Sequence, residues 1–310
     1  MDLTRYADPA AFAGRAGPFL LRHEAEHNLT LGLLGAMQRQ PTLPTPPATP
    51  PYLATLEEGG EVRAVALRTP PHRLVLSRIG PGVDPPAGAP DAAPLGVDKV
   101  AEEVTEHLVA DLAGHSPDLS GVLGPPAFAG VFAGRWAERL GKQARRGMAT
   151  RIFQLDAVTP APAAQGVAGA LRPATEADLD LLIRWVAAFT RDIGERGEAD
   201  EARARAGVSR TIAAGGLHLW EVEGAGPVSM ANATGATPSG IRINMVYTPP
   251  ELRRRGYASA CVGALSQAQL DAGRRFCFLY TDLANPTSNH IYQELGYRPG
   301  ADADTYDFTD

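Results

Sequence analysis

The stretch VYTPPELRRRGYASA, residues 246–260, places three arginines and a glycine between an extended apolar segment and an expected helix. Pro249 and Pro250 keep the entry extended, because a residue before a proline is disfavoured in the helical region. The first N–H groups of a helix lack partners within it, and the helix dipole adds about half a positive charge there. Gly256 allows close backbone approach, and the arginines add fixed charge. The stretch therefore predicts a local anion site that suits a pyrophosphate.

The composition limits the classes of protein to which the chain can belong. It has 310 residues, 44% of them hydrophobic, with a formal net charge of −6. This length predicts two domains of roughly 150 residues each. The acidic balance argues against a general nucleic-acid surface, and no basic or aromatic pattern extends the arginine turn toward a DNA contact. No signal peptide and no apolar run of about 18 residues is visible, so we expect a cytoplasmic protein without membrane contact.

Cysteines and histidines give no pattern of a metal site. Cys261 and Cys277 lie in apolar runs, without the spacing of metal ligands or of a disulfide framework, and we interpret them as core residues. His23 and His27 are four residues apart on an expected helix, but no third ligand is evident. We expect no metal.

Proline-rich segments divide the chain at 40–51, 80–94 and 159–166, and the last is interpreted as a linker between domains. The first half is expected to run helix, three strands, helix, strand, helix, strand, and the second half repeats a similar order. The predicted class is α/β with mixed sheets, in two domains over 1–160 and 161–310. The main expected helices are 19–37, 97–113, 128–141, 174–189, 196–214, 256–273 and 285–296; the main expected strands are 52–58, 60–69, 73–79, 119–124, 148–158, 170–173, 217–223, 227–234, 240–248, 275–282, 297–299 and 304–308.

A second motif follows the arginine turn by about thirty residues, in LANPTSNHIYQELGYRP. Asn285 and Pro286 suit a helix start, because proline is tolerated at the first helical position. Asn285, Asn289 and Tyr292 are spaced i, i+4 and i+7, which predicts one shared helix face. That face is polar and carries a phenol, which a purely structural amphipathic helix would not favour.

These two motifs resemble those of the GCN5-related N-acetyltransferase (GNAT) superfamily. Its acetyl-CoA signature R/Q-x-x-G-x-G/A matches residues 253–258. Its later N-x-x-A-x-x-x-Y-x-x-x-G-F pattern matches Asn285, Tyr292, Gly296 and Tyr297, with Ser288 in place of the alanine. The resemblance covers residues 165–310 and is limited to the order of elements over 1–160. It implies tandem GNAT-like domains of the bacterial two-domain type, each a mostly antiparallel twisted sheet flanked by helices.

The resemblance also implies a cofactor site for acetyl-CoA. The strand before the arginine turn should splay from its neighbour and bind pantetheine through the backbone of Met245, Val246 and Tyr247. The amide of Val246 or Tyr247 would stabilise the oxyanion. Asn285 and Asn289 would contact the cofactor arm. The remaining cofactor-binding residues would be those of the first motif: Arg253, Arg254, Arg255, Gly256, Tyr257 and Ala258.

For catalysis, the resemblance places Tyr292 as the general acid that protonates the leaving thiolate. Asp282 is our candidate for the base that deprotonates the acceptor ammonium, with Glu221, His218 and a water relay as alternatives. The expected reaction is direct attack of a primary amine on the thioester, without an acetyl-enzyme. The alternative hypothesis is a CoA-binding or sensing module without turnover.

The partners implied are a small-molecule or peptide amine and no nucleic acid, and the protein is expected to be a monomer or a homodimer. Acceptor choice is expected to lie with residues 191–207. The first half has no arginine turn before its helix at 97–113 and lacks the Asn and Tyr positions over 124–141. It is therefore expected to be a degenerate copy that supports the catalytic half or shapes the acceptor pocket.

Overall fold

The computed structural model describes residues 1–39, 49–80, 99–194 and 201–310, which form two compact units. Unit 1 comprises Met1–Phe153, Tyr280–Asn285 and Pro299–Asp310, and unit 2 comprises Gln154–Leu279 and Pro286–Arg298. The break at 153/154 lies near the predicted boundary at 160/161. The division differs from the predicted one in that two short segments from the end of the chain pack in unit 1.

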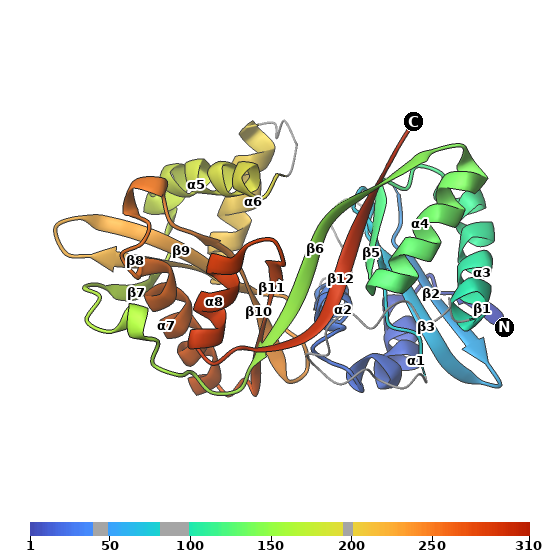
Figure 1. Cartoon of the computed structure of the whole chain (residues 1–310), viewed down its shortest axis with the longest axis horizontal. Helices are drawn as coiled ribbons and strands as arrows, with labels where there is room; N and C mark the ends of the chain where they lie inside the picture. Colours follow the sequence, from blue (N-terminus) through green and yellow to red (C-terminus); the bar gives the residue numbers. More distant parts are fainter. Residues whose placement is uncertain (40–48, 81–98, 195–200) are drawn as a thin grey trace. The chain divides into compact units, whose positions relative to one another are not determined.

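The same order of helices and strands occurs twice along the chain (Figure 1), which confirms the predicted α/β class. The first copy runs β1 (Asp2–Arg5), α1 (Pro9–Leu21), α2 (Asn28–Arg39), β2 (Tyr52–Glu58), β3 (Glu61–Arg68), β4 (Leu74–Leu76), α3 (Lys99–His115), β5 (Gly121–Gly124), α4 (Pro126–Leu140) and β6 (Gln143–Leu155). The second runs β7 (Ala170–Pro173), α5 (Leu179–Asp192), α6 (Glu201–Ala213), β8 (Leu217–Val222), β9 (Gly226–Thr234), β10 (Gly240–Tyr247), α7 (Tyr257–Asp271), β11 (Phe276–Asp282), α8 (Pro286–Glu294) and β12 (Arg298–Thr309).

The beginning of the chain differs from the prediction. The single helix expected over 19–37 is wrong, because α1 ends at Leu21 and α2 begins at Asn28. Buried His27 fixes the turn between them, with its Nδ1 2.9 Å from the Leu20 carbonyl oxygen. The start of α1 was missed, although Asp8 caps it by accepting two backbone N–H groups and Pro9 follows at the first position.

The sheet of unit 1 runs in the order β1-β2-β3-β4-β5-β12-β6. The pairs β1–β2, β2–β3, β3–β4 and β5–β12 are antiparallel, and the pair β4–β5 is parallel. The last strand of the chain, β12, therefore completes this sheet between β5 and β6 (Figure 1). Acidic side chains of β12 meet basic ones of β6, with N···O distances of 2.8 Å for Arg146–Asp304 and 2.6 Å for Arg151–Asp302. Opposite charges on neighbouring strands favour this pairing.

Each face of the unit 1 sheet buries its own apolar cluster, because side chains alternate along β2. Leu53 packs with residues of α1 and α2, whereas Ala54 and Leu56 pack with residues of α3 and α4. Phe308 of β12 joins the second cluster, with its ring centre 6.1 Å from that of Trp136. The end of the chain is thus part of the core.

In unit 2 the order is β11-β10-β9-β8-β7, antiparallel except for β10 and β11. Helices α5 and α6 cover one face, over Leu217, Leu219 and Met230, and α7 lies on the other side of β8 and β9 (Figure 1). The helix expected over 174–189 is preceded by a capping box of Thr175 and Asp178. Cys261 and Cys277 are buried, as predicted.

The segment interpreted as a linker is packed within unit 2. The Thr159 N–H donates to the Leu295 carbonyl oxygen at 2.9 Å, and the Trp220 indole N–H donates to the Ala168 carbonyl oxygen at 3.0 Å. Ala161 is 1% exposed. These contacts bind the segment to the end of α8 and to β8.

Two classes of feature have no example in the part of the chain that the structure describes. No helix there combines the length and the apolar character that crossing a bilayer needs. Nor do three or more His, Cys, Asp or Glu side chains gather there in a group that could hold a metal ion.

Replacing Phe308 with alanine should lower the free energy of unfolding by about 3 kcal/mol, because it removes a buried ring and leaves a cavity. Denaturant unfolding measures the change. Leu21→Ala is the control in the same unit, since Leu21 is 43% exposed; it should change the free energy by less than about 1 kcal/mol. Equal effects of the two substitutions would show that β12 is not part of the core.

Acid should destabilise unit 1 through His27. Burial lowers the pKa of His27 from 6.5 to about 4. As the pH falls from 6.5 to 4 the unfolded chain takes up a proton that the folded chain does not, and about 3 kcal/mol of stability is lost. Denaturant unfolding at several pH values should show a shallower dependence for His27→Gln over this window. An unchanged dependence would refute the assignment to His27.

Candidate active site

Strands β10 and β11 of unit 2 part before β10 ends. Gly240–Arg242 of β10 pair in parallel with Phe276–Phe278 of β11, whereas β10 continues to Tyr247. On its other side β10 pairs with β9, and the register shifts between Asn244 and Tyr247. Tyr247 lies opposite Met230, and Asn244 lies opposite Asn232.

This register shift is a β-bulge at Met245 and Val246. Met245 has a φ of 50°, which is uncommon for a residue with a side chain. A bulge leaves its extra residue outside the regular ladder, so backbone groups here can bind something other than β9. These are two of the three residues predicted to bind pantetheine, and the third, Tyr247, follows at the end of the strand.

In the turn after β10, several successive backbone N–H groups have no acceptor among the described residues. Arg254 has a φ of 61° and Gly256 a φ of 78°, both in the left-handed region. The N–H groups of residues 254–259 donate to no acceptor in the described ranges, and the first backbone bond of α7 runs from Ala260 N–H to Gly256 O. No side chain of a described residue caps α7, and its first turn has no acidic residue. Successive N–H groups in such a turn form a concave anion site.

Gly256 is required here for two reasons. Its φ of 78° disfavours any residue with a Cβ, and a Cβ would lie 1.9 Å from the carbonyl oxygen of Ala163. Ala163 belongs to the short 3₁₀-helix Pro162–Ala164 in the segment before β7. The glycine therefore lets this segment pack against the start of α7.

The three arginines of the turn have exposed side chains with different contacts. Arg253 donates through Nε to the Thr248 carbonyl oxygen at 3.0 Å and through Nη2 to Asp192 at 2.6 Å. Arg255 donates to the Glu251 carbonyl oxygen at 3.2 Å. Arg254 makes no hydrogen bond or ion pair with another described residue. The next predicted residues, Tyr257 and Ala258, are half-buried in the first turn of α7.

Tyr292 lies on α8, is 9% exposed and meets the ring of Tyr297 edge-on, with 6.0 Å between ring centres. Burial raises the pKa of the Tyr292 phenol to about 12. The phenol therefore keeps its proton at neutral pH, as a general acid must. Asn289, also on α8, is half-buried. Asn285 is exposed, precedes the helix and belongs to unit 1.

The candidate bases are held by other groups. Asp282 belongs to unit 1, where its Oδ1 accepts the N–H of Ala284 at 2.8 Å. The Nδ1 of His218 lies 2.9 Å from the carbonyl oxygen of Gly216. In both cases the contact fixes the direction of the side chain.

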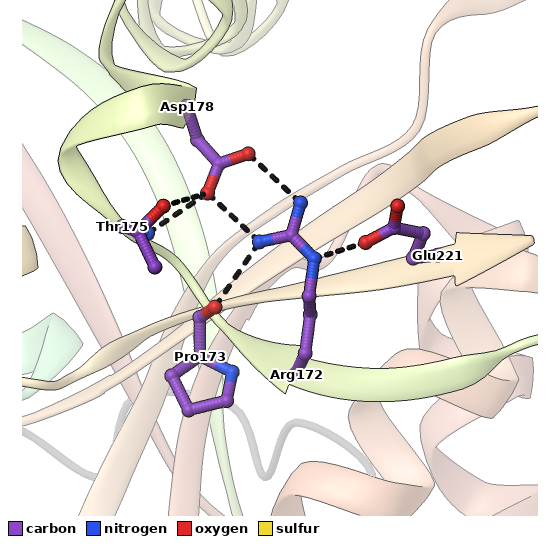
Figure 2. Close-up of polar contacts among 5 residues, drawn as sticks. All are labelled: Arg172, Pro173, Thr175, Asp178 and Glu221. Atoms are coloured by element: carbon purple, nitrogen blue, oxygen red, sulfur yellow. Dashed lines mark hydrogen bonds and ion pairs between the residues drawn. The ribbon is translucent and has the colours of Figure 1, made fainter.

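Glu221 forms an ion pair with Arg172 (Figure 2). The Arg172 guanidinium also donates a hydrogen bond to each carboxylate oxygen of Asp178, both at 2.8 Å. Thr175 donates to the same carboxylate through its backbone N–H and its hydroxyl. The hydrogen bonds from Arg172 are the main reason that the pKa of Asp178 falls to about 2. Glu221 is thus part of a network that fixes the start of α5 to the sheet.

The cysteines do not suit nucleophilic chemistry. Burial raises the pKa of both Cys261 and Cys277 to about 12, so neither is a thiolate at neutral pH.

Residues 223–305 match the family described as FR47-like protein. No curated protein sequence matches the chain. Solved structures with a similar fold include a GNAT-family acetyltransferase from Colwellia psychrerythraea (10% identity, TM-score 0.54, all of both chains covered). A GCN5-related N-acetyltransferase from Sphaerobacter thermophilus is 16% identical, with a TM-score of 0.56 over 98% of this chain and 94% of that one. A Drosophila protein is 12% identical, with a TM-score of 0.63 over 99% and 98%. At these identities the similarity shows a shared fold.

If the open N–H groups at the start of α7 hold the diphosphate of coenzyme A, Gly256→Ala should abolish its binding, because a Cβ would displace the start of α7. Isothermal titration calorimetry with coenzyme A measures this loss. Gly207→Ala on α6 is the control, since a Cβ there would meet no described atom within 4 Å. This substitution should leave the heat of coenzyme A binding unchanged. Undiminished binding by Gly256→Ala would show that the anion site lies elsewhere.

Proposed function

We propose that this chain, a member of the GCN5-related N-acetyltransferase superfamily, transfers an acetyl group from acetyl-CoA to a primary amine. The observation that carries the proposal is the row of N–H groups over residues 254–259 with no acceptor in the described part of the chain. These donors would bind the diphosphate of the cofactor, and the exposed Arg254 and Arg255 would add positive charge.

The bulge in β10 supports a place for the pantetheine arm. The pairing of β10 with β11 covers Gly240–Arg242. Later in β10, the backbone at the bulge would hydrogen-bond the pantetheine arm as it would a neighbouring strand. Acetyl-CoA supplies the activated acetyl group as a thioester. The N–H of Val246 or Tyr247 would stabilise the negative charge that forms on the carbonyl oxygen when an amine attacks.

Tyr292 is the proposed general acid. The acceptor nitrogen forms the new C–N bond, the C–S bond breaks, and the phenol would give its proton to the departing thiolate. A pKa of about 12 keeps that proton on Tyr292 until the thiolate forms. Asn289 lies three residues earlier on the same helix and, with Asn285, is proposed to contact the cofactor arm.

The proton released by the acceptor is assigned to Asp282 or to a water relay. Glu221 is a poorer candidate because its carboxylate is already paired with Arg172. Direct attack in a ternary complex is favoured, since neither cysteine is available as a thiolate. The acceptor is proposed to be a small molecule or a peptide.

Unit 1 is proposed to support the catalytic unit without binding the cofactor. Its backbone N–H groups just after β4 are occupied: Ser77 donates to Val65 O, Arg78 to His27 Nε2 and Gly80 to Arg63 O. The proline-rich stretch expected at 80–94 lies, from residue 81, outside the described residues.

Tyr292→Phe should lower kcat by about 100-fold and leave the affinity for acetyl-CoA nearly unchanged, because only the proton donor is lost. Steady-state acetylation of a panel of primary amines provides the measurement. Tyr297→Phe is the matched control: its hydroxyl bonds Ser266 at 2.8 Å, so removing it should affect stability and not kcat.

Two results would contradict the proposal. Equal kcat values for Tyr292→Phe and Tyr297→Phe would show that Tyr292 is not the general acid. Binding of acetyl-CoA by the wild type without turnover of any amine in the panel would indicate the non-catalytic CoA-binding module instead.

A further inference from the structure

The motif assigns Arg253 to the diphosphate, but its side chain contacts other groups in the protein. Its Nε donates to the carbonyl oxygen of Thr248 at 3.0 Å, and its Nη2 lies 2.6 Å from Asp192 Oδ2. Its guanidinium carbon lies 5.9 Å from the ring centre of Tyr247, within the range of a cation–π contact. These three contacts all hold it toward the end of β10 and the end of α5.

Side chains hold both carbonyl groups at the exit of β10. The hydroxyl of Ser229 donates to the Tyr247 carbonyl oxygen at 3.1 Å, while Arg253 holds the next carbonyl, that of Thr248. Ser229 is fully buried, and its Oγ also lies 2.9 Å from Thr248 Oγ1. Because a peptide group is planar, fixing the Tyr247 carbonyl also fixes the direction of the Thr248 N–H. The Thr248 carbonyl belongs to the peptide bond with Pro249, which has no N–H, so Arg253 fixes the plane of that bond. The backbone just after the bulge is therefore oriented before any ligand arrives.

The partner of Arg253 is placed where a carboxylate is otherwise unfavourable. Asp192 is the last residue of α5, where the helix dipole disfavours negative charge. Its pairing with Arg253 offsets that cost and ties the end of α5 to the arginine turn. The same helix also packs on β10, with 6.0 Å between the ring centres of Trp185 and Tyr247.

We propose that Arg253 is a positioning residue that fixes the exit of β10 against α5, and that it does not bind the diphosphate. The diphosphate is then held by the N–H groups of residues 254–259 together with Arg254 and Arg255. This inference rests on the proposed acetyltransferase function and changes the role that the motif gives to its first arginine. It also makes Asp192, outside both motifs, a second positioning residue.

A substrate without the diphosphate separates the two roles of Arg253. Acetyl-pantetheine keeps the thioester and the pantetheine arm but lacks the nucleotide. If Arg253 positions β10, Arg253→Gln should lower kcat/KM for acetyl-CoA and for acetyl-pantetheine by the same factor, about tenfold to 100-fold. Arg255→Gln should lower kcat/KM for acetyl-CoA alone, by about tenfold.

Asp192 provides an independent test. Asp192→Asn should reproduce the loss seen with Arg253→Gln on both substrates, and the double variant should be no worse than either single one, because the two side chains act as a pair. Asp180→Asn is the matched control on α5, since Asp180 pairs with Arg205 at 2.5 Å, away from the turn. It should leave both kcat/KM values unchanged.

Two results would refute the inference about Arg253, and a third would refute the proposed function. A loss with acetyl-CoA only for Arg253→Gln, with no effect of Asp192→Asn, would make Arg253 a diphosphate ligand and refute the inference while the proposed function stands. A common loss that tracks a lowered melting temperature in every variant, Asp180→Asn included, would also refute it. Absence of heat when coenzyme A is added to the wild type would instead refute the proposed function.

Discussion

The candidate site depends on one backbone constraint, the left-handed turn that joins β10 to α7. Gly256 takes a φ of 78° with the Ala163 carbonyl against its Cα, and Arg254 takes a φ of 61° two residues earlier. A non-glycine residue in this region is strained by about 1–2 kcal/mol, and the packing around the turn has to hold it. The result is a row of N–H donors over residues 254–259 for which the described part of the chain supplies no acceptor.

Tertiary packing prepares this turn from several sides. The segment before β7 lies against Gly256, Ser229 holds the carbonyl at the end of β10, and Arg253 reaches back to Thr248 and Asp192. A site fixed in this way loses little conformational entropy when a ligand binds. The groups that make these contacts lie outside the motif or are backbone carbonyls. No pattern of residue types in the sequence therefore marks them.

The two copies of the element order can be compared only in part. After β10, two left-handed residues lie beside N–H groups that have no acceptor in the described part of the chain. Directly after β4, neighbouring groups accept the N–H groups of Ser77, Arg78 and Gly80, and from residue 81 the connection to α3 lies outside the described residues. The last strand shows a clear difference between the copies, because β12 ends the second copy in sequence yet completes the sheet of unit 1 through its pairing with β5. Repetition in the sequence therefore does not imply equivalence in packing.

The sequence by itself determined the α/β class, the strands from 170 to 282 and the helix over 256–273, because alternation, glycines and prolines act over short distances. It also located the arginine turn and Tyr292, since a motif states residue types at fixed spacing. Only the tertiary structure decided that helix 19–37 breaks, that β12 belongs to unit 1, and that Glu221 and Arg253 are already paired. Those outcomes depend on contacts between residues distant in sequence, which local propensity does not encode.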